Sequence, residues 1–347
     1  MSSAPPAFDL DEIPDFVERS DVPVSVADAS ADALLVYVNP AFERLTGYAA
    51  VDCIERNCRF LQGPSTDPAA VARIRAGIEA REFRLTMLSN YRADGAEFTN
   101  ALLVGPVDEA SGGASGEALA RVGLQWDVGD VLERRRARLR EAHWDVSGPS
   151  MRLEHFERLV LLTIDASRGC DPGGDPMALV ERLVALAHPH QYPPHDRLPN
   201  WTDAGSLLPF LVRPYGLGLR DELRTEDRPG IVAVDVAYAL SLAVHALALA
   251  TWNRSTPSAR IERGGALDVL CRPTSFRGEP VLELLWQVPT PRGAGSESAA
   301  VRARSELDVV ARLFEWLGGT FEFGFDRARL SAMLRLPNRP LTVLDDA

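Results

Sequence analysis

Lysine is absent from this chain of 347 residues, so all 37 of its lysine and arginine positions are arginine. Chemistry that needs a lysine, as a Schiff-base former or as the phosphate-binding residue of a P-loop, is therefore excluded. Hydrophobic residues make up 46% of the chain and charged residues 25%, which is ordinary for a globular protein with a sizeable core. The length leaves room for two or three domains.

Positive charge is also scarce, because 49 acidic residues outnumber the arginines and give a net charge of −12. Such a chain is repelled by nucleic-acid phosphates and by anionic membranes, and we expect neither as a partner. The local exception is the basic run Arg134-Arg135-Arg136 with Arg138 and Arg140. A solvated helix face is the ordinary explanation for a run of this kind.

Cysteine is rare, and the chain contains only Cys53, Cys58, Cys170 and Cys271. They form no CxxC pair, and the amino terminus lacks a basic and apolar signal segment. The nearest approach to a membrane helix, Val232 to Thr251, is interrupted by Asp235 and His245. We therefore expect a reduced, cytoplasmic protein whose stimulus reaches the cytosol, such as light or a small molecule.

The first part of the chain is expected to be an α+β domain. Residues 1–20 form an N-terminal cap, with a short amphipathic helix over Asp11–Arg19 that has Pro14 in its first turn. Within residues 21–129, helical patterns cover Ala41–Leu45 and Pro68–Arg81. Strand patterns cover Pro23–Asp28, Leu34–Val38, Phe83–Leu88, Thr99–Pro106 and Ala120–Val128. These elements predict a small antiparallel sheet with helices on one face.

Residues 130–200 read as helical. A linker helix runs on from Gly129, and Met177–His188 follows the turn Gly169–Pro176 as the second helix of a helical hairpin. Such a hairpin resembles a docking or dimerisation unit and makes a homodimer an open expectation. Residues 201–340 are expected to be a second domain of α/β type, from helices at Leu207–Pro214 and Tyr238–Trp252 and strands at Leu267–Cys271, Val281–Val288 and Thr320–Phe325.

The run Asn57-Cys58-Arg59-Phe60-Leu61-Gln62 places one thiol among polar side chains. A lone cysteine is ordinarily a small buried apolar residue. Asn57 and Gln62, together with Asn90 and Asn100, supply amides that can both donate to and accept from the carbonyl and ring-nitrogen edge of a flavin. The pattern therefore indicates a flavin site around Cys58.

Two arginines and three leucines complete this candidate site. Arg59 and Arg75 suit a phosphate through the bidentate fork of the guanidinium, although surface arginines are their plain alternative. Leu61, Leu85 and Leu102 would wall the flavin ring, and they would be equally at home in any core.

Residues 21–129 closely resemble the LOV (light, oxygen, voltage) branch of PAS domains, the blue-light receptors of plants and bacteria that bind flavin mononucleotide (FMN). The matching segments are Asn39–Phe42, Leu45–Tyr48, Asn57–Gly63, Thr66–Pro68, Ile74–Arg75, Asn90–Gly95, Asn100 and Gly123–Gln125. The resemblance implies that Arg59 and Arg75 clamp the FMN phosphate. It also implies that Cys58 forms a reversible cysteinyl–flavin adduct in blue light. Gln125 then rotates its amide to follow the newly protonated flavin N5, and so relays the signal toward the linker helix.

The second half resembles, at lower similarity, the HWE class of sensor histidine kinases and its ATP-binding α/β sandwich. Glu154-His155-Phe156-Glu157-Arg158-Leu159 stands where that class has its phosphoacceptor box, so His155 is the expected phosphoacceptor. A structural helix histidine is the alternative. Arg182–His188 resembles the second hairpin helix, and Trp201–Tyr215 the entry to the ATP-binding domain. A response regulator or another signalling protein is the partner that this resemblance implies.

This half departs from the kinase pattern at its metal and phosphate motifs. The His-Glu-Leu-Ala-Thr-Asn pattern of the class, whose asparagine binds Mg2+, reads His245-Ala246-Leu247-Ala248-Leu249-Ala250. Asn253 could be a displaced ligand, one turn further along the helix. The Trp-x-Glu of the class becomes Trp286-Gln287-Val288, which loses a second carboxylate, and its Gly-x-Gly turn falls on Ala303-Arg304-Ser305.

Two hypotheses for the output follow. In the first, the second half is a degenerate kinase scaffold that binds neither ATP nor Mg2+, and light regulates its binding to a partner protein. In the second, it is a working kinase that binds both and phosphorylates His155. The alanine at the asparagine position favours the first, because phosphoryl transfer depends on metal and positioning. A light-gated dimerisation module overlaps with the first hypothesis.

Overall fold

The computed structural model of the chain describes residues 13–108, 118–129, 148–170, 176–191, 201–215, 231–251, 268–276, 278–289, 297–325 and 329–338. The chain forms two compact units. The first comprises Met1–Leu161 and Pro172–Val184, and the second comprises Leu162–Asp171 and Ala185–Ala347. The mixed α+β class expected from the sequence is confirmed, and the four domain boundaries stay a prediction.

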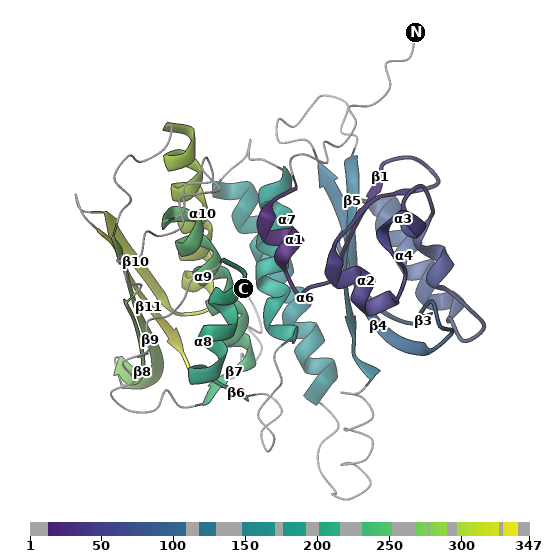
Figure 1. The fold of residues 1–347 in the computed structure, drawn as a ribbon. Helices are drawn as coiled ribbons and strands as arrows, with labels where there is room; N and C mark the ends of the chain where they lie inside the picture. Colours follow the sequence, from purple (N-terminus) through teal and green to yellow (C-terminus); the bar gives the residue numbers. More distant parts are fainter. Residues whose placement is uncertain are drawn as a thin grey trace, which may run out of the picture. The chain divides into compact units, whose positions relative to one another are not determined.

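An antiparallel sheet of five strands, in the order β2-β1-β5-β4-β3, forms the centre of the first unit (Figure 1). Its strands are β1 (Val24–Asp28), β2 (Leu35–Val38), β3 (Arg84–Tyr91), β4 (Glu97–Asp108) and β5 (Ala118–Asp127). Each lies where the sequence predicted a strand. The Ser111–Gly116 loop between β4 and β5 lies outside the described residues.

Helices cover one face of this sheet (Figure 1). They are α2 (Pro40–Thr46), α3 (Ala50–Cys53), the 3-10 helix η2 (Cys58–Leu61) and α4 (Pro68–Ala80). The predicted helices α2 and α4 both begin with a proline after a capping side chain: Asn39 accepts from Phe42 N, and Asp67 accepts from Ala69 N. The short α3 and η2 had no counterpart in the expected elements.

Strand alternation divides the side chains of the sheet between two faces. Toward the helices point the polar and aliphatic residues Ser25, Leu88, Asn90, Asn100, Leu102 and Gln125, which line a cavity. The opposite face carries the buried residues Val24, Val26, Leu103, Leu124 and Trp126. Leu85 is paired with Leu103 and shares its face, so the expectation that Leu85 walls the flavin ring is wrong. The sequence pattern predicted the strand, but it did not show which of its residues face the helices.

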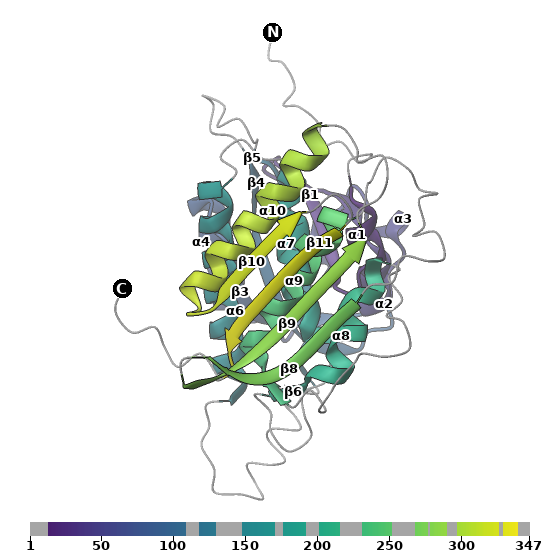
Figure 2. The same cartoon turned by 90° about the vertical axis from the view of Figure 1, so that its left-hand side faces the viewer.

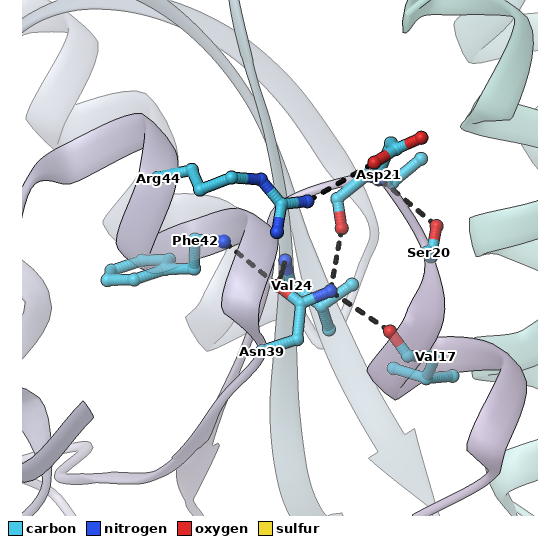
Figure 3. A network of polar contacts seen from close by, with 8 residues as sticks. Val17, Ser20, Asp21, Val24, Asn39, Phe42 and Arg44 are labelled. Carbon is cyan, nitrogen blue, oxygen red and sulfur yellow. Dashed lines mark hydrogen bonds and ion pairs between the residues drawn. The ribbon is translucent and has the colours of Figure 1, made fainter. Parts of the chain in front are cut away.

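One buried amide joins three elements at the edge of this sheet (Figure 3). The Asn39 side chain is fully buried; its Oδ1 accepts from Val24 N at 2.9 Å and from Phe42 N at 3.0 Å, and its Nδ2 donates to Val17 O at 3.0 Å and Val22 O at 2.9 Å. Val17 belongs to α1 (Asp15–Arg19), Val24 begins β1, and Phe42 lies in α2. A single side chain therefore holds the amino-terminal helix against the sheet.

Charged contacts at the surface add to this attachment of α1. The Tyr37 hydroxyl donates to the Glu18 carboxylate, and Arg44 forms an ion pair of 3.2 Å with Asp21 (Figure 3). The helix begins at Asp15, and Pro14 is its N-cap in an extended conformation. The expectation that Pro14 lies in the first helical turn is therefore wrong, because its backbone (ψ 139°) has not entered the helix.

The predicted helical hairpin corresponds to α6 (Gly148–Cys170) and α7 (Pro176–Ala187), followed by the 3-10 helix η3 (His188–Gln191). The linker helix predicted after Gly129 and the turn at 171–175 lie outside the described residues. No helix within the described residues has the length and apolar character needed to cross a membrane.

The second unit contains an antiparallel sheet in the order β10-β11-β9-β8, viewed face-on in Figure 2 with α9 and α10 behind it. Its strands are β8 (Asp268–Phe276), β9 (Glu279–Pro289), β10 (Thr320–Phe325) and β11 (Arg329–Pro337). The helices are α8 (Ala204–Val212), α9 (Val234–Thr251) and α10 (Glu297–Trp316), and β6 (Trp201–Asp203) pairs with β7 (Ile231–Ala233). A short 3-10 helix, η4 (Arg213–Tyr215), follows α8.

Candidate functional site

A cavity of about 540 Å³ lies between the sheet and the helices of the first unit. Except for Leu85, the residues that the sequence assigned to the flavin site line it: Asn57, Cys58, Arg59, Leu61, Gln62, Arg75, Asn90, Asn100, Leu102 and Gln125. They come from η2 and its flanks, from α4 and from strands β3, β4 and β5. The fold thus brings together residues that are up to 68 positions apart, counted from Asn57 to Gln125.

Cys58 begins the 3-10 helix η2, which Asn57 caps by accepting from Arg59 N at 2.9 Å. The Asn57 Nδ2 donates to the backbone oxygens of Asp32 and, at 3.3 Å, Ala33. The Asn57 amide therefore positions the cysteine-bearing turn against the loop between β1 and β2. The sequence indicated a flavin contact for this residue; its described partners are backbone groups.

The Cys58 thiol is held in its protonated form. Burial, together with a smaller contribution from the neighbouring thiol Cys53, raises its pKa to about 12. Both sulfurs belong to one apolar cluster with Phe42 and Leu61. At neutral pH Cys58 therefore carries its proton into any reaction at the cavity.

Three amides form a continuous hydrogen-bonded row along the cavity. Asn100 Nδ2 donates to Asn90 Oδ1 at 2.8 Å and to Gln125 Oε1 at 3.0 Å, and Asn90 Nδ2 donates to Leu61 O at 3.2 Å. All three amide side chains are at least 97% buried. The Asn100 Oδ1 is buried and has no hydrogen-bond partner among the residues that the structure describes. A buried acceptor in this position fits a ligand with donor groups.

The two predicted phosphate-binding arginines, Arg59 and Arg75, are exposed members of the cavity lining. Within the described part of the chain, neither guanidinium makes an ion pair or a side-chain hydrogen bond. A third lining arginine, Arg121, was missed by the sequence reasoning. Its guanidinium donates to Asp28 O at 2.7 Å and Ala29 O at 3.2 Å, so it holds the loop after β1.

His155 lies on α6, where it is half-buried. The next residue, Phe156, is fully buried and packs edge-on against Trp126, with ring centroids 5.3 Å apart. Trp126 follows Gln125 on β5. The expected phosphoacceptor is therefore one residue from an aromatic contact with the strand that carries the expected relay.

The kinase-like motifs fall on helix α9 and its surroundings. His245 is fully buried, and its Nδ1 lies 2.8 Å from the Tyr215 hydroxyl. Ala246 is fully buried and Ala250 is half-buried, so neither expected polar position carries a polar side chain. Asn253 and the glycine pairs at 216–218 and 293–295 lie outside the described residues.

The expected position of the Gly-x-Gly turn, residues 303–305, lies inside the helix α10. A helix interior cannot form a phosphate-cradling loop, and these three positions carry no glycine. The described residues contain no group of three or more His, Cys, Asp or Glu side chains that could hold a metal ion.

A family model described as PAS domain matches residues 24–120, the segment that forms the cavity-bearing sheet. The cavity is therefore that of a PAS sensor domain. The chain is 30% identical over 317 residues to blue-light-activated histidine kinase 1 of Erythrobacter litoralis, a match that covers 88% of this chain and 82% of that protein. The chain belongs to the family of blue-light-activated histidine kinases.

Two further comparisons agree with this assignment. A blue-light-activated histidine kinase of Rhizobium johnstonii is 37% identical over 178 residues, which is 50% of this chain and 49% of that protein. The solved structure of the Erythrobacter litoralis EL346 blue-light activated histidine kinase has a TM-score of 0.56 at 21% identity and covers 93% of this chain and 96% of its own. At that identity the similarity shows a shared fold.

Proposed function

We propose that this chain is a blue-light receptor that binds FMN in the cavity of its PAS domain and forms a reversible bond between Cys58 and the flavin. The observation that carries the proposal is the convergence of one protonated thiol, three buried amides and two exposed arginines on one cavity. The flavin, when bound, supplies the light absorption and a ring carbon that accepts the sulfur.

The residues of the cavity fit such a cofactor. The amide row can donate to and accept from the edge of the ring, and the buried Asn100 Oδ1 needs a donor. Arg59 and Arg75 at the exposed end of the lining suit a phosphate monoester. The choice of FMN over a flavin without a phosphate rests on these two arginines.

Three residues have distinct roles in this proposal. Cys58 supplies both the sulfur and the proton, because its raised pKa keeps the thiol protonated. Gln125 senses the protonation change at the flavin, because an amide can present either its oxygen or its nitrogen. Trp126 and Phe156 then connect β5 with the helix that carries His155.

For the output we propose a kinase-like scaffold that signals by binding a partner, either a response regulator or another signalling protein. Its support is the apolar character of α9, where Ala246 is fully buried and Ala250 stands in place of the metal-binding asparagine. Without that ligand, Mg2+ and ATP lose their main anchor. A homodimer through the hairpin is proposed to use α6, where Leu161 is exposed, because α7 is almost wholly buried within the chain.

A working kinase is the second candidate, and membership in a family of histidine kinases favours it. In that case His155, half-buried on α6, accepts the phosphoryl group and passes it to a response regulator. The two outputs make opposite predictions for the same labelling experiment.

Optical spectroscopy tests the sensor. Purified protein is expected to be yellow, to lose its flavin absorption in blue light and to regain it in darkness. Cys58→Ala is expected to keep the flavin and to abolish this bleaching, whereas Cys53→Ala, a change at the neighbouring thiol, keeps it. Reversible bleaching of Cys58→Ala to the same spectrum would contradict the proposal.

Incubation of dark and illuminated protein with radiolabelled ATP and Mg2+ tests the output. The scaffold predicts no incorporation in either state. Incorporation that His155→Ala abolishes would show the working kinase instead. Incorporation that persists in His155→Ala would contradict both candidates, since the label would then lie elsewhere.

A further inference from the structure

Ser25 is a buried polar residue of the cavity to which the sequence assigned no function. It lies on β1, is 5% exposed and contributes to the cavity lining. Its Oγ accepts from Gln125 Nε2 at 3.4 Å and donates to Gly123 O at 3.4 Å. Both bonds are long, so the hydroxyl can exchange partners at low cost.

The amide row determines how Gln125 faces Ser25. Asn100 Nδ2 uses both of its hydrogens, one on Asn90 Oδ1 and one on Gln125 Oε1. The Gln125 oxygen is thereby directed to Asn100, and the Gln125 nitrogen faces Ser25. A half turn of the Gln125 amide would exchange these two atoms and present the oxygen to Ser25.

A serine hydroxyl can satisfy either orientation, because it carries one donor and two acceptor positions. It accepts from Nε2 in the described orientation, and after the half turn it can leave Gly123 O and donate to Oε1. The glycine opposite makes room for this movement. A Cβ at Gly123 would lie 2.8 Å from Ser25 Oγ and 3.5 Å from Leu102 Cδ1.

We propose that Ser25 is a positioning residue for Gln125, whose hydroxyl follows the amide through its half turn by changing from acceptor to donor. This inference rests on the proposed function, because it assigns Ser25 a part in the same light-driven switch. Ser25 acts through Gln125 and needs no contact with the flavin.

The direction of the effect follows from what each orientation loses without the hydroxyl. In the described orientation, a buried N–H of Gln125 would lose its acceptor. In the turned orientation, the Gln125 carbonyl oxygen would lose the Ser25 hydroxyl as a donor. An orphaned buried N–H is rarer than an under-satisfied carbonyl, which indicates that it is the costlier loss. In this proposal the described orientation belongs to the dark state and the turned orientation to the lit state. Removal of the hydroxyl should therefore disfavour the described orientation and slow the return from the lit state.

Threonine and valine at position 25 provide a matched pair, since they have nearly the same shape and differ in one hydroxyl. Ser25→Thr is expected to regain its dark absorption at close to the wild-type rate. Ser25→Val is expected to be about five-fold slower, the effect of one net hydrogen bond. Ala27→Val, a change at another lining residue of the same strand, controls for added volume. Equal rates for Ser25→Thr and Ser25→Val would overturn the proposal.

Two further measurements show whether the effect passes through Gln125. In a Gln125→Leu background, the difference between threonine and valine at position 25 should vanish. In light-minus-dark infrared spectra of protein with isotope-labelled glutamine carbonyls, the band that Gln125→Leu removes should shift in Ser25→Val and stay in place in Ser25→Thr. A difference that persists in Gln125→Leu, or a Gln125 band that stays in place in Ser25→Val, would count against the proposal.

Failure of the proposed function has a separate signature. Wild-type protein that carries no flavin, or that does not bleach, would refute the light-sensing proposal before any variant is compared. The proposed role of Ser25 is refuted only when wild-type protein bleaches and recovers while Ser25→Thr and Ser25→Val regain their dark absorption at the same rate.

Discussion

The two units of this protein bury different kinds of polar side chain. In the first unit, amides are prominent among the buried polar side chains: Asn90, Asn100 and Gln125 line the cavity, and Asn39 joins α1, β1 and α2. In the second unit, buried histidines are prominent: His188 stacks on Phe210 with ring centroids 4.4 Å apart, and His245 meets Tyr215. Amides exchange hydrogen bonds without a change of charge, whereas a buried histidine couples folding to pH.

The comparison extends to function. Polar side chains of the first unit converge on a cavity, and every residue predicted for the cofactor except Leu85 lies in its lining. In the second unit, the kinase-like motif falls on helix α9. Positions 246 and 250, where the motif of the class has polar residues, are both alanine. The cavity therefore gathers polar side chains, whereas the two motif positions on α9 carry none.

Asn39 offers the sharpest test of the amide network. Asn39→Ala removes four hydrogen bonds of a fully buried side chain, including the N-cap of α2. We expect a loss of about 3 kcal/mol in the free energy of unfolding, since buried partners are left unsatisfied. Urea denaturation measures the effect. Arg44→Ala, which breaks only the exposed pair with Asp21, should cost less than about 1 kcal/mol. Equal losses in the free energy of unfolding would show that the buried Asn39 amide contributes no more to stability than the exposed ion pair.

The arginine pair tests whether the cavity is specific for a phosphate. Replacement of both Arg59 and Arg75 by alanine should weaken FMN binding by about 100-fold, because two charged hydrogen-bond donors are lost. Binding of riboflavin, which has the same ring and no phosphate, should change by less than about three-fold. Fluorescence titration of the flavin-free protein measures both. A parallel loss for both flavins would mean that the arginines act on the fold of the cavity.

His188 tests the second unit. Burial lowers the pKa of His188 to about 4, below its ordinary value of about 6.5. Above pH 6.5 the residue is neutral in both states and has no effect. As the pH falls from 6.5 toward 4, only the unfolded chain takes up the proton, so stability is lost. Between pH 7 and pH 5 this loss amounts to about 2 kcal/mol.

His188→Gln should remove that part of the pH dependence, as seen in urea denaturation at the two pH values. If His188→Gln lost as much unfolding free energy as wild-type protein between the two pH values, other groups would govern the acid sensitivity of the fold.

The sequence predicted most of the first unit because its signals are local. Asn39-Pro40 and Asp67-Pro68 specify helix starts by capping, and alternation specifies the strands. Leu85 was misplaced because a run of strand residues does not show which face is inward, and the register with Leu103 decides that. Ser25 was missed because a serine in a strand has no signal of its own, and only its position across from Gly123 and near Gln125 gives it a role.

Predictions for the second unit were poorer because they depended on counting between motifs. Residues 303–305 were matched to a glycine turn by their distance from Gly318, yet they lie in the middle of α10. Loops tolerate insertions and deletions, so a count of residues between two motifs does not fix the position of an element. Strand β11 and helix α10 had no expected counterparts at all.

The attachment of α1 by Asn39 has a consequence for hydrogen exchange. The same amide that accepts from Val24 N and Phe42 N also donates to the backbone of α1 at Val17. Detachment of α1 alone costs the side chain its bond to Val17 O, whereas complete rotation of Asn39 would break its contacts with α1, β1 and α2 together. The amino-terminal helix, the first residue of β1 and the start of α2 should consequently exchange their amide hydrogens as one cooperative unit rather than as a fraying end.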